Sequence, residues 1–172
     1  MKHQLLLVRQ RGLVHNGPVT AGSDPRHYFA YGSNMLRRQM QARCPGSRFV
    51  GPARLRGHRL AFTRRSLKWQ GGVADIIPAT DAETWGGLFE VSSDHVAALD
   101  VAEGHPLAYE RRMVVVETLS GAPVDAWVYV VVDKVSSVVP TLEYWQAMVD
   151  GAVDCELPGE YLAMLRALRH SG

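Results

Sequence analysis

Cysteine is scarce in this chain of 172 residues, and its two cysteines, Cys44 and Cys155, lie far apart in the sequence. Two isolated cysteines cannot build the disulfide framework of a small secreted domain, and neither belongs to a Cys-x-x-Cys pair. We therefore expect a protein of a reducing compartment, and the cytoplasm is the simplest assignment.

Long apolar runs and an excess of one charge are also missing. No stretch approaches the roughly 20 apolar residues of a membrane helix, and the apolar run at residues 5–8 is too short for a signal peptide. The formal net charge is only +2, so bulk charge predicts no nucleic acid and no membrane as a partner. The basic residues at positions 54–68 are interpreted as a solvated face. Both a monomer and a homodimer fit.

Metal-ligand spacing is absent as well. The 7 histidines form no pair with the spacing of a zinc site, and no cysteine lies close enough in sequence to join them. Ser33 does not belong to a Gly-x-Ser-x-Gly turn, so nothing predicts a hydrolase triad. We expect no metal site.

Apolar residues, by contrast, are plentiful. They make up 47% of the chain, which is enough to form the buried core of one domain. Residues 1–25 contain glycine and proline without sustained periodicity, and we interpret them as an N-terminal extension. It is either a flexible segment or the result of an assigned start that lies too far upstream. Residues 26–172 form the predicted domain. Alternating and β-branched runs predict strands. Ser92 and Thr141 are predicted to start helices, and Gly104 to end the first of them. The expected strands are 27–31, 59–63, 73–78, 84–91, 111–118 and 124–132, and the expected helices are 35–43, 93–103, 141–153 and one after residue 158.

The order of these elements indicates the fold class. The strands cluster and do not alternate regularly with helices, which argues against a doubly wound parallel sheet. The prediction is an α+β fold, a small mixed β-barrel with flanking helices.

The first candidate site is the glycine turn Tyr31, Gly32, Ser33 and Asn34, between a strand and a helix start. Backbone N–H groups at a helix start have no intrahelical partner and suit an anion such as a carboxylate. Asn34 adds a side-chain donor and acceptor, and Gly32 is expected to need a positive φ. The local pattern by itself fits an ordinary helix start, capped by Ser33 or Asn34, better than a binding site.

The second candidate is Glu103, at the end of the predicted helix 93–103. Val96, Leu99 and Glu103 share one helix face, so a buried Leu99 implies an inward-facing carboxyl group. Partial desolvation and the negative end of the helix dipole would both raise its pKa, which suits a group that exchanges protons near neutral pH. The competing interpretation, slightly favoured by the local pattern, is a structural glutamate that reaches water or pairs with Arg111 or Arg112.

Taken in order, the motifs of the chain resemble those of the γ-glutamylcyclotransferases. Residues 29–35 (Phe-Ala-Tyr-Gly-Ser-Asn-Met) are similar to that family's substrate loop, and Leu99-Asp100, Glu103-Gly104 and Tyr109 to its catalytic-glutamate segment. Further matches follow in the same order at residues 43–45, 53–55, 72–76, 85–86, 140, 144 and 157–161. The resemblance spans about residues 27–168, and the Ser-Asn-Met version of the loop places the chain with the broad γ-glutamylcyclotransferase group.

The resemblance implies the same barrel fold and a set of site residues. Gly32, Ser33 and Asn34 would line the glutamyl-binding loop, and Glu103 would be the general acid/base. Tyr31, Tyr109 and Tyr144 fall where the family places site tyrosines. The segment between Gly104 and Tyr109 varies among relatives and would shape the side that holds the leaving group.

The implied partner is a small γ-glutamyl compound, and the implied reaction needs no cofactor. The substrate's own α-amine attacks the γ-carbonyl and closes 5-oxoproline, so the protein supplies orientation and proton transfer. Two alternatives stay open. One is a cyclotransferase that deprotects a γ-glutamylated intermediate of a specialised pathway, and the other is a non-catalytic small-molecule-binding module on the same fold.

Overall fold

A computed structural model describes residues 27–168 of the chain; the proposed extension, residues 1–25, lies outside the described residues. Strands and helices follow one another as β1 (His27–Ala30), the 3-10 turn η1 (Ser33–Met35), α1 (Arg37–Arg43), β2 (Arg48–Ser66), β3 (Gly71–Glu90), α2 (Ser93–Glu103), β4 (Tyr109–Thr118), β5 (Pro123–Val131), α3 (Leu142–Asp154) and α4 (Gly159–Ala167). No helix in this part of the chain has the length and apolar character to cross a bilayer.

The strands close into a barrel in the order β1-β3-β2-β4-β5. Strand β1 runs antiparallel to β3 and parallel to β5, and all other pairs are antiparallel. Closure pairs the edge strands with each other and leaves no open sheet edge. This confirms the predicted α+β class, a small mixed barrel with flanking helices.

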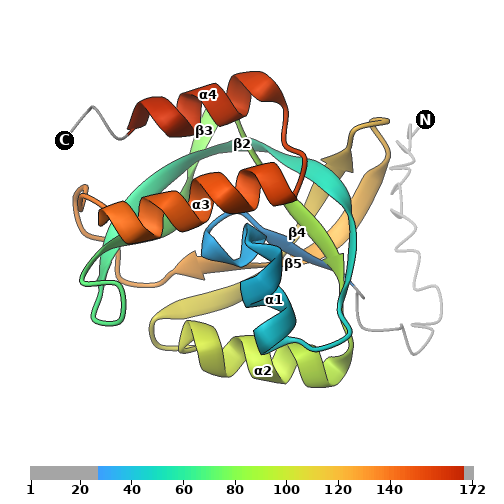
Figure 1. Cartoon of the computed structure of the whole chain (residues 1–172), viewed down its shortest axis with the longest axis horizontal. Coiled ribbons are helices and arrows are strands. Elements are labelled where there is room, and N and C mark those ends of the chain that lie inside the picture. The colour runs from blue at the N-terminus through green and yellow to red at the C-terminus, as the bar shows by residue number, and fades with distance from the viewer. Residues whose placement is uncertain (1–26, 169–172) are drawn as a thin grey trace, which may run out of the picture.

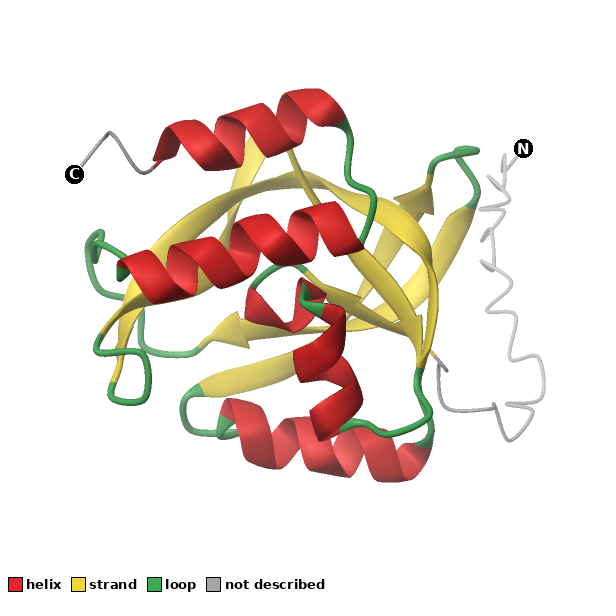
Figure 2. Ribbon diagram, in the orientation of Figure 1, coloured by secondary structure: helices red, strands yellow, loops and turns green. Residues whose placement is uncertain are grey.

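The helices lie outside the barrel and form two pairs, in which α1 packs on α2 and α3 on α4 (Figures 1 and 2). Helix α3 also packs against η1. Gly151 permits this approach, since a Cβ there would lie 2.5 Å from the backbone nitrogen of Leu36. The contact presses the loop after β1 against the barrel, which fixes the backbone that carries Ser33 and Asn34.

The long hairpin of β2 and β3 differs from the predicted separate strands 59–63, 73–78 and 84–91. The two strands form one long hairpin whose register shifts at three points, between Phe49 and Gly51, Arg56 and His58, and Phe62 and Arg64. Residues 81–83, expected to separate two strands, lie within β3, but the pairing with β2 lapses at this point, because Arg56 pairs with Glu83 and His58 with Pro78. Glu83 resumes the pairing, and its side chain accepts from Arg54 across the hairpin and pairs with Arg56.

The helix predicted for residues 35–43 is also different. It is divided by the extended residue Leu36 into η1 and α1, and neither Ser33 nor Asn34 caps it. Both side chains are buried and form hydrogen bonds with other side chains instead. A capping interaction and a role in a buried network compete for the same polar atoms.

The predicted caps of the later helices agree with the structure. Ser92 caps α2 with a capping box, and Gly104 ends it with φ +67°. Thr141 caps α3 by accepting from the Tyr144 backbone N–H. Strand β4 begins at Tyr109, two residues before the predicted start, because its pairing with β5 extends from Tyr109 and Val131.

Candidate active site

Helix α2 directs Glu103 inward, as its spacing predicted. Leu99 is buried and Val96 packs at the edge of the core, so the face they share with Glu103 is turned to the protein interior. The side chain of Glu103 is 18% exposed. The carboxyl group is therefore mostly removed from water but still accessible.

Two sets of contacts hold α2 in place. Asp100 accepts hydrogen bonds from Arg111 at 2.7 Å and from the Tyr129 hydroxyl at 2.6 Å, which ties the helix to β4 and β5. The ring of His95 lies 2.9 Å from the backbone oxygen of Pro45, which ties it to the loop after α1. Because Arg111 is committed to Asp100, it does not pair with Glu103.

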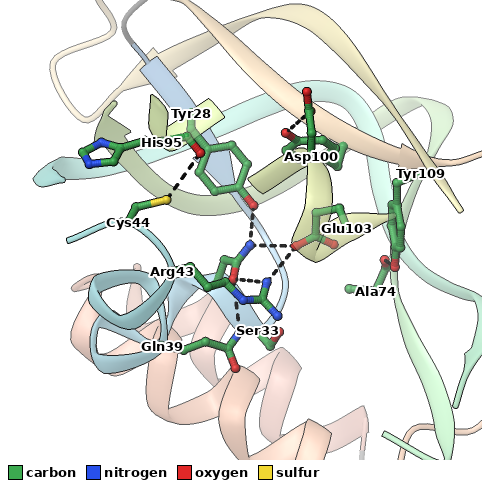
Figure 3. Close-up of polar contacts among 12 residues, drawn as sticks. Tyr28, Ser33, Gln39, Arg43, Cys44, Ala74, His95, Asp100, Glu103 and Tyr109 are labelled. Carbon is green, nitrogen blue, oxygen red and sulfur yellow. Dashed lines mark hydrogen bonds and ion pairs between the residues drawn. The ribbon is translucent and has the colours of Figure 1, made fainter. Parts of the chain in front are cut away.

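Glu103 pairs with Arg43, at the end of α1. The sequence had suggested Arg111 or Arg112 instead. Arg43 and the Asn34 side chain each donate to Glu103 Oε1 at 2.9 Å (Figure 3). Arg112 interacts instead with Glu110. No hydrogen bond within residues 27–168 involves Glu103 Oε2. The carboxyl group is thus fixed through one oxygen and leaves the other open.

Asn34 uses its whole hydrogen-bonding capacity within this network. It donates to Glu103 and to the Tyr28 hydroxyl, both at 2.9 Å. Its oxygen accepts from Arg43 at 2.7 Å and from Gln39 at 3.1 Å. An amide group offers two donors and two acceptor sites, so the Asn34 side chain orients Glu103 and has nothing left for a ligand.

Burial and charge act on Glu103 in opposite directions. Removal from water raises the pKa of the Glu103 carboxyl, while Arg43, Asn34 and the Lys68 ammonium oppose that rise. The net direction is upward, so a proton is held at higher pH than on an ordinary glutamate. Burial also raises the pKa of the nearby Cys44 thiol to about 11, which keeps it protonated and makes it a poor nucleophile.

A cavity opens beside Glu103. Its inner part has a volume of about 30 Å³, and its outer part about 310 Å³. The two parts adjoin, since Ser33, Glu103, Tyr109 and Tyr144 line both. All the residues proposed from the sequence come together here, for the inner part is lined by Tyr31, Gly32, Ser33, Asn34, Glu103, Tyr109 and Tyr144, with Tyr28, Ala74 and Tyr129.

The hydroxyl groups of the three predicted tyrosines contact backbone. Tyr109 donates to the Ala74 oxygen and Tyr144 accepts from the Ala74 N–H, both at 2.9 Å, while Tyr31 donates to the backbone oxygen of Tyr129. Burial raises the pKa of all three. Tyr144 therefore keeps its proton, and because it accepts from Ala74 that proton can be donated to a ligand.

Comparison with known proteins places the chain in a family. Residues 28–147 match the family described as gamma-glutamyl cyclotransferase, AIG2-like. The chain is 31% identical to the γ-glutamylcyclotransferase of Mus musculus and 32% identical to that of Homo sapiens, each over 146 residues that make up 82% of this chain and 77% of the relative. This chain belongs to the γ-glutamyl cyclotransferase, AIG2-like family. A solved structure titled gamma-glutamyl cyclotransferase superposes with a TM-score of 0.78 at 31% identity, covering 82% of this chain and 86% of the other.

Two residues of the hydrogen-bond network around Asn34 were not predicted from the sequence. Gln39 and Arg43 lie one helical turn apart on α1 and both reach Asn34. Their i, i+4 spacing was a usable signal, because such residues share a helix face. What the spacing could not reveal is that this face meets the end of α2.

The expected positive φ at Gly32 is wrong, since its φ is −111°. The glycine is needed for space. A Cβ at this position would lie 3.0 Å from the Tyr144 hydroxyl and 3.1 Å from the Ala74 Cβ.

Within the described residues, no three histidine, cysteine, aspartate or glutamate side chains gather in the manner of metal ligands.

Proposed function

We propose that this chain is a γ-glutamylcyclotransferase that releases 5-oxoproline from a γ-glutamyl amide, with Glu103 as general acid/base. The observation that carries the proposal is the Glu103 carboxyl group. It belongs to a residue that lines the cavity, and Arg43 and Asn34 hold it through Oε1, so that no hydrogen bond within residues 27–168 occupies Oε2. The names of its relatives support the same activity.

The reaction suits a site that lacks an activated nucleophile. The α-amine of the substrate attacks its own γ-carbonyl carbon, forming the ring C–N bond. Glu103 Oε2 takes the proton that the amine must lose and delivers it to the leaving nitrogen as the amide C–N bond breaks. The products are 5-oxoproline and a free amine, and Glu103 returns to its starting state.

The remaining cavity residues serve orientation. Folding the glutamyl chain so that amine and carbonyl meet accounts for much of the gain in an intramolecular reaction. The loop that bears Gly32 and Ser33 and the Tyr144 hydroxyl face the same inner cavity, where they would hold the substrate carboxylate or carbonyl. A donor aimed at the developing oxyanion lowers the barrier further.

The reducing cytosol remains the proposed location. Cys44 and Cys155 are both free and buried, as expected where disulfides do not form.

The proposal is tested by incubating the protein with γ-glutamyl amino acids, glutathione and γ-glutamylamines and following the products by mass spectrometry. We expect 5-oxoproline and the free amine in equal amounts. Free glutamate in place of 5-oxoproline would identify a hydrolase. Binding of these compounds without turnover of any of them would instead support the non-catalytic module.

Gly32→Ala is expected to lower kcat/KM by about tenfold, because the new methyl group displaces Tyr144 or Ala74 at the inner cavity and small displacements of site groups are costly. The matched control is Gly159→Ala at the start of α4, where a Cβ meets nothing within 4 Å. Kinetics on the best substrate and thermal unfolding of both variants are the measurements. If Gly32→Ala kept the wild-type kcat/KM, the role proposed for Gly32 in shaping the inner cavity would be contradicted.

A further inference from the structure

The outer part of the cavity is bordered by the end of the β2–β3 hairpin, which is rich in positive charge. Arg64, Arg65 and Lys68 line it, and Arg43 reaches it from α1. The sole carboxylate among the lining residues is Glu103, which already pairs with Arg43. Three cations of the hairpin therefore face this space without a carboxylate to balance them.

Three other arginines of β2 are neutralised within the protein. Arg48 pairs with Glu90, and Arg54 and Arg56 pair with Glu83 and Glu117. Within residues 27–168 no ion pair involves the three hairpin cations. The basic residues at 54–68 were interpreted from the sequence as one solvated face, but they are divided. Arg54 and Arg56 form ion pairs and Arg59 faces a different cavity, whereas the three hairpin cations line the outer part of the site.

The unpaired charges act on the site itself. The Lys68 ammonium opposes the upward shift of the Glu103 pKa, and the Arg64 guanidinium does the same for the pKa of Tyr109. Arg64 is partly buried, so its charge is less screened by water than that of a fully exposed side chain. An anion in the outer cavity would lie in the same positive field.

We propose that this outer cavity binds the leaving group through its carboxylates, and that Arg64 and Lys68 select leaving groups bearing two carboxylates over those with one or none. The inference rests on the proposed function. The inner part, at about 30 Å³, is too small for the whole glutamyl group and can take only one end of it. With that end directed inward and the scissile amide at Glu103, the leaving amine must extend into the outer part. One carboxylate balances one cation and leaves the others unpaired, whereas a dicarboxylate such as an acidic amino acid balances two.

The test compares two nearly isosteric substrates, γ-glutamylglutamate and γ-glutamylglutamine, which differ by one negative charge on the leaving group. We expect kcat/KM for 5-oxoproline release at low ionic strength to be about three- to tenfold higher for γ-glutamylglutamate, the scale of a partly exposed ion pair. The preference should weaken as salt is added. Using a ratio cancels any general damage to folding or to the glutamyl side.

The variant is Arg64→Gln combined with Lys68→Gln, in which the ratio should fall to about one. The control is Arg59→Gln, an exposed arginine of the same strand that faces a different cavity, and it should keep the wild-type ratio. Equal kcat/KM for both substrates in the wild type, or a ratio that persists in the double variant, overturns this inference while 5-oxoproline release upholds the proposed function. Absence of 5-oxoproline from both substrates would overturn the two together.

Discussion

Glu103→Gln is expected to lower kcat by about 100-fold or more, the usual contribution of a general acid/base. Glutamine has the shape of glutamate and retains an oxygen that can accept from Arg43 and Asn34, so the surrounding network stays assembled. What is lost is the ability to take a proton from the attacking amine and return it to the leaving nitrogen. KM should change little. The measurement is 5-oxoproline release under saturating substrate.

The control for this variant is Glu160→Gln, which makes the same chemical change at an exposed residue of α4, and it should retain wild-type kcat. Thermal unfolding of both proteins checks that they are folded. A Glu103→Gln protein within about tenfold of wild type would assign the proton transfer to another group, because a shuttle that contributes less than that is not the principal acid/base.

The sequence predicted those parts of the site that depend on local geometry. Helical spacing alone aimed Glu103 inward, since Leu99 had to be buried and both share one face. The caps Ser92, Gly104 and Thr141 were readable because a capping side chain or a left-handed glycine acts within a few residues. The mixed barrel followed from clustered strands.

Features that depend on distant contacts could not be predicted in the same way. Arg43 and Glu103 are 60 residues apart and meet because α1 packs on α2. Asn34 was interpreted as a cap or a ligand group, but its amide is used up by partners on β1, α1 and α2. Gly32 illustrates the same limit, for its need of space is set by Tyr144 of α3.

Arg43→Gln is expected to move the acidic limb of the kcat/KM profile to higher pH. Among the groups around Glu103, Arg43 is the strongest influence against the rise in pKa that burial causes. A charge pair of this kind shifts a carboxyl pKa by about 1 to 3 units, so removing the guanidinium lets the carboxyl keep its proton to a correspondingly higher pH. The base must be ionised to act. At a fixed pH on the acidic limb, kcat/KM of the variant should therefore be lower than that of the wild type by about tenfold for each unit by which the pKa has risen.

The pH profile separates this electrostatic role from a structural one. If Arg43 merely held α1 against α2, its loss would lower kcat/KM at every pH and leave the limb in place. Arg43→Lys retains the positive charge beside Glu103 and should keep the limb near its wild-type position even though one hydrogen bond is altered. Arg38→Gln, at an exposed residue of the same helix, removes an equal charge away from the site and should change neither limb nor rate. An unshifted limb in Arg43→Gln would mean that burial and Asn34 alone set the protonation of Glu103.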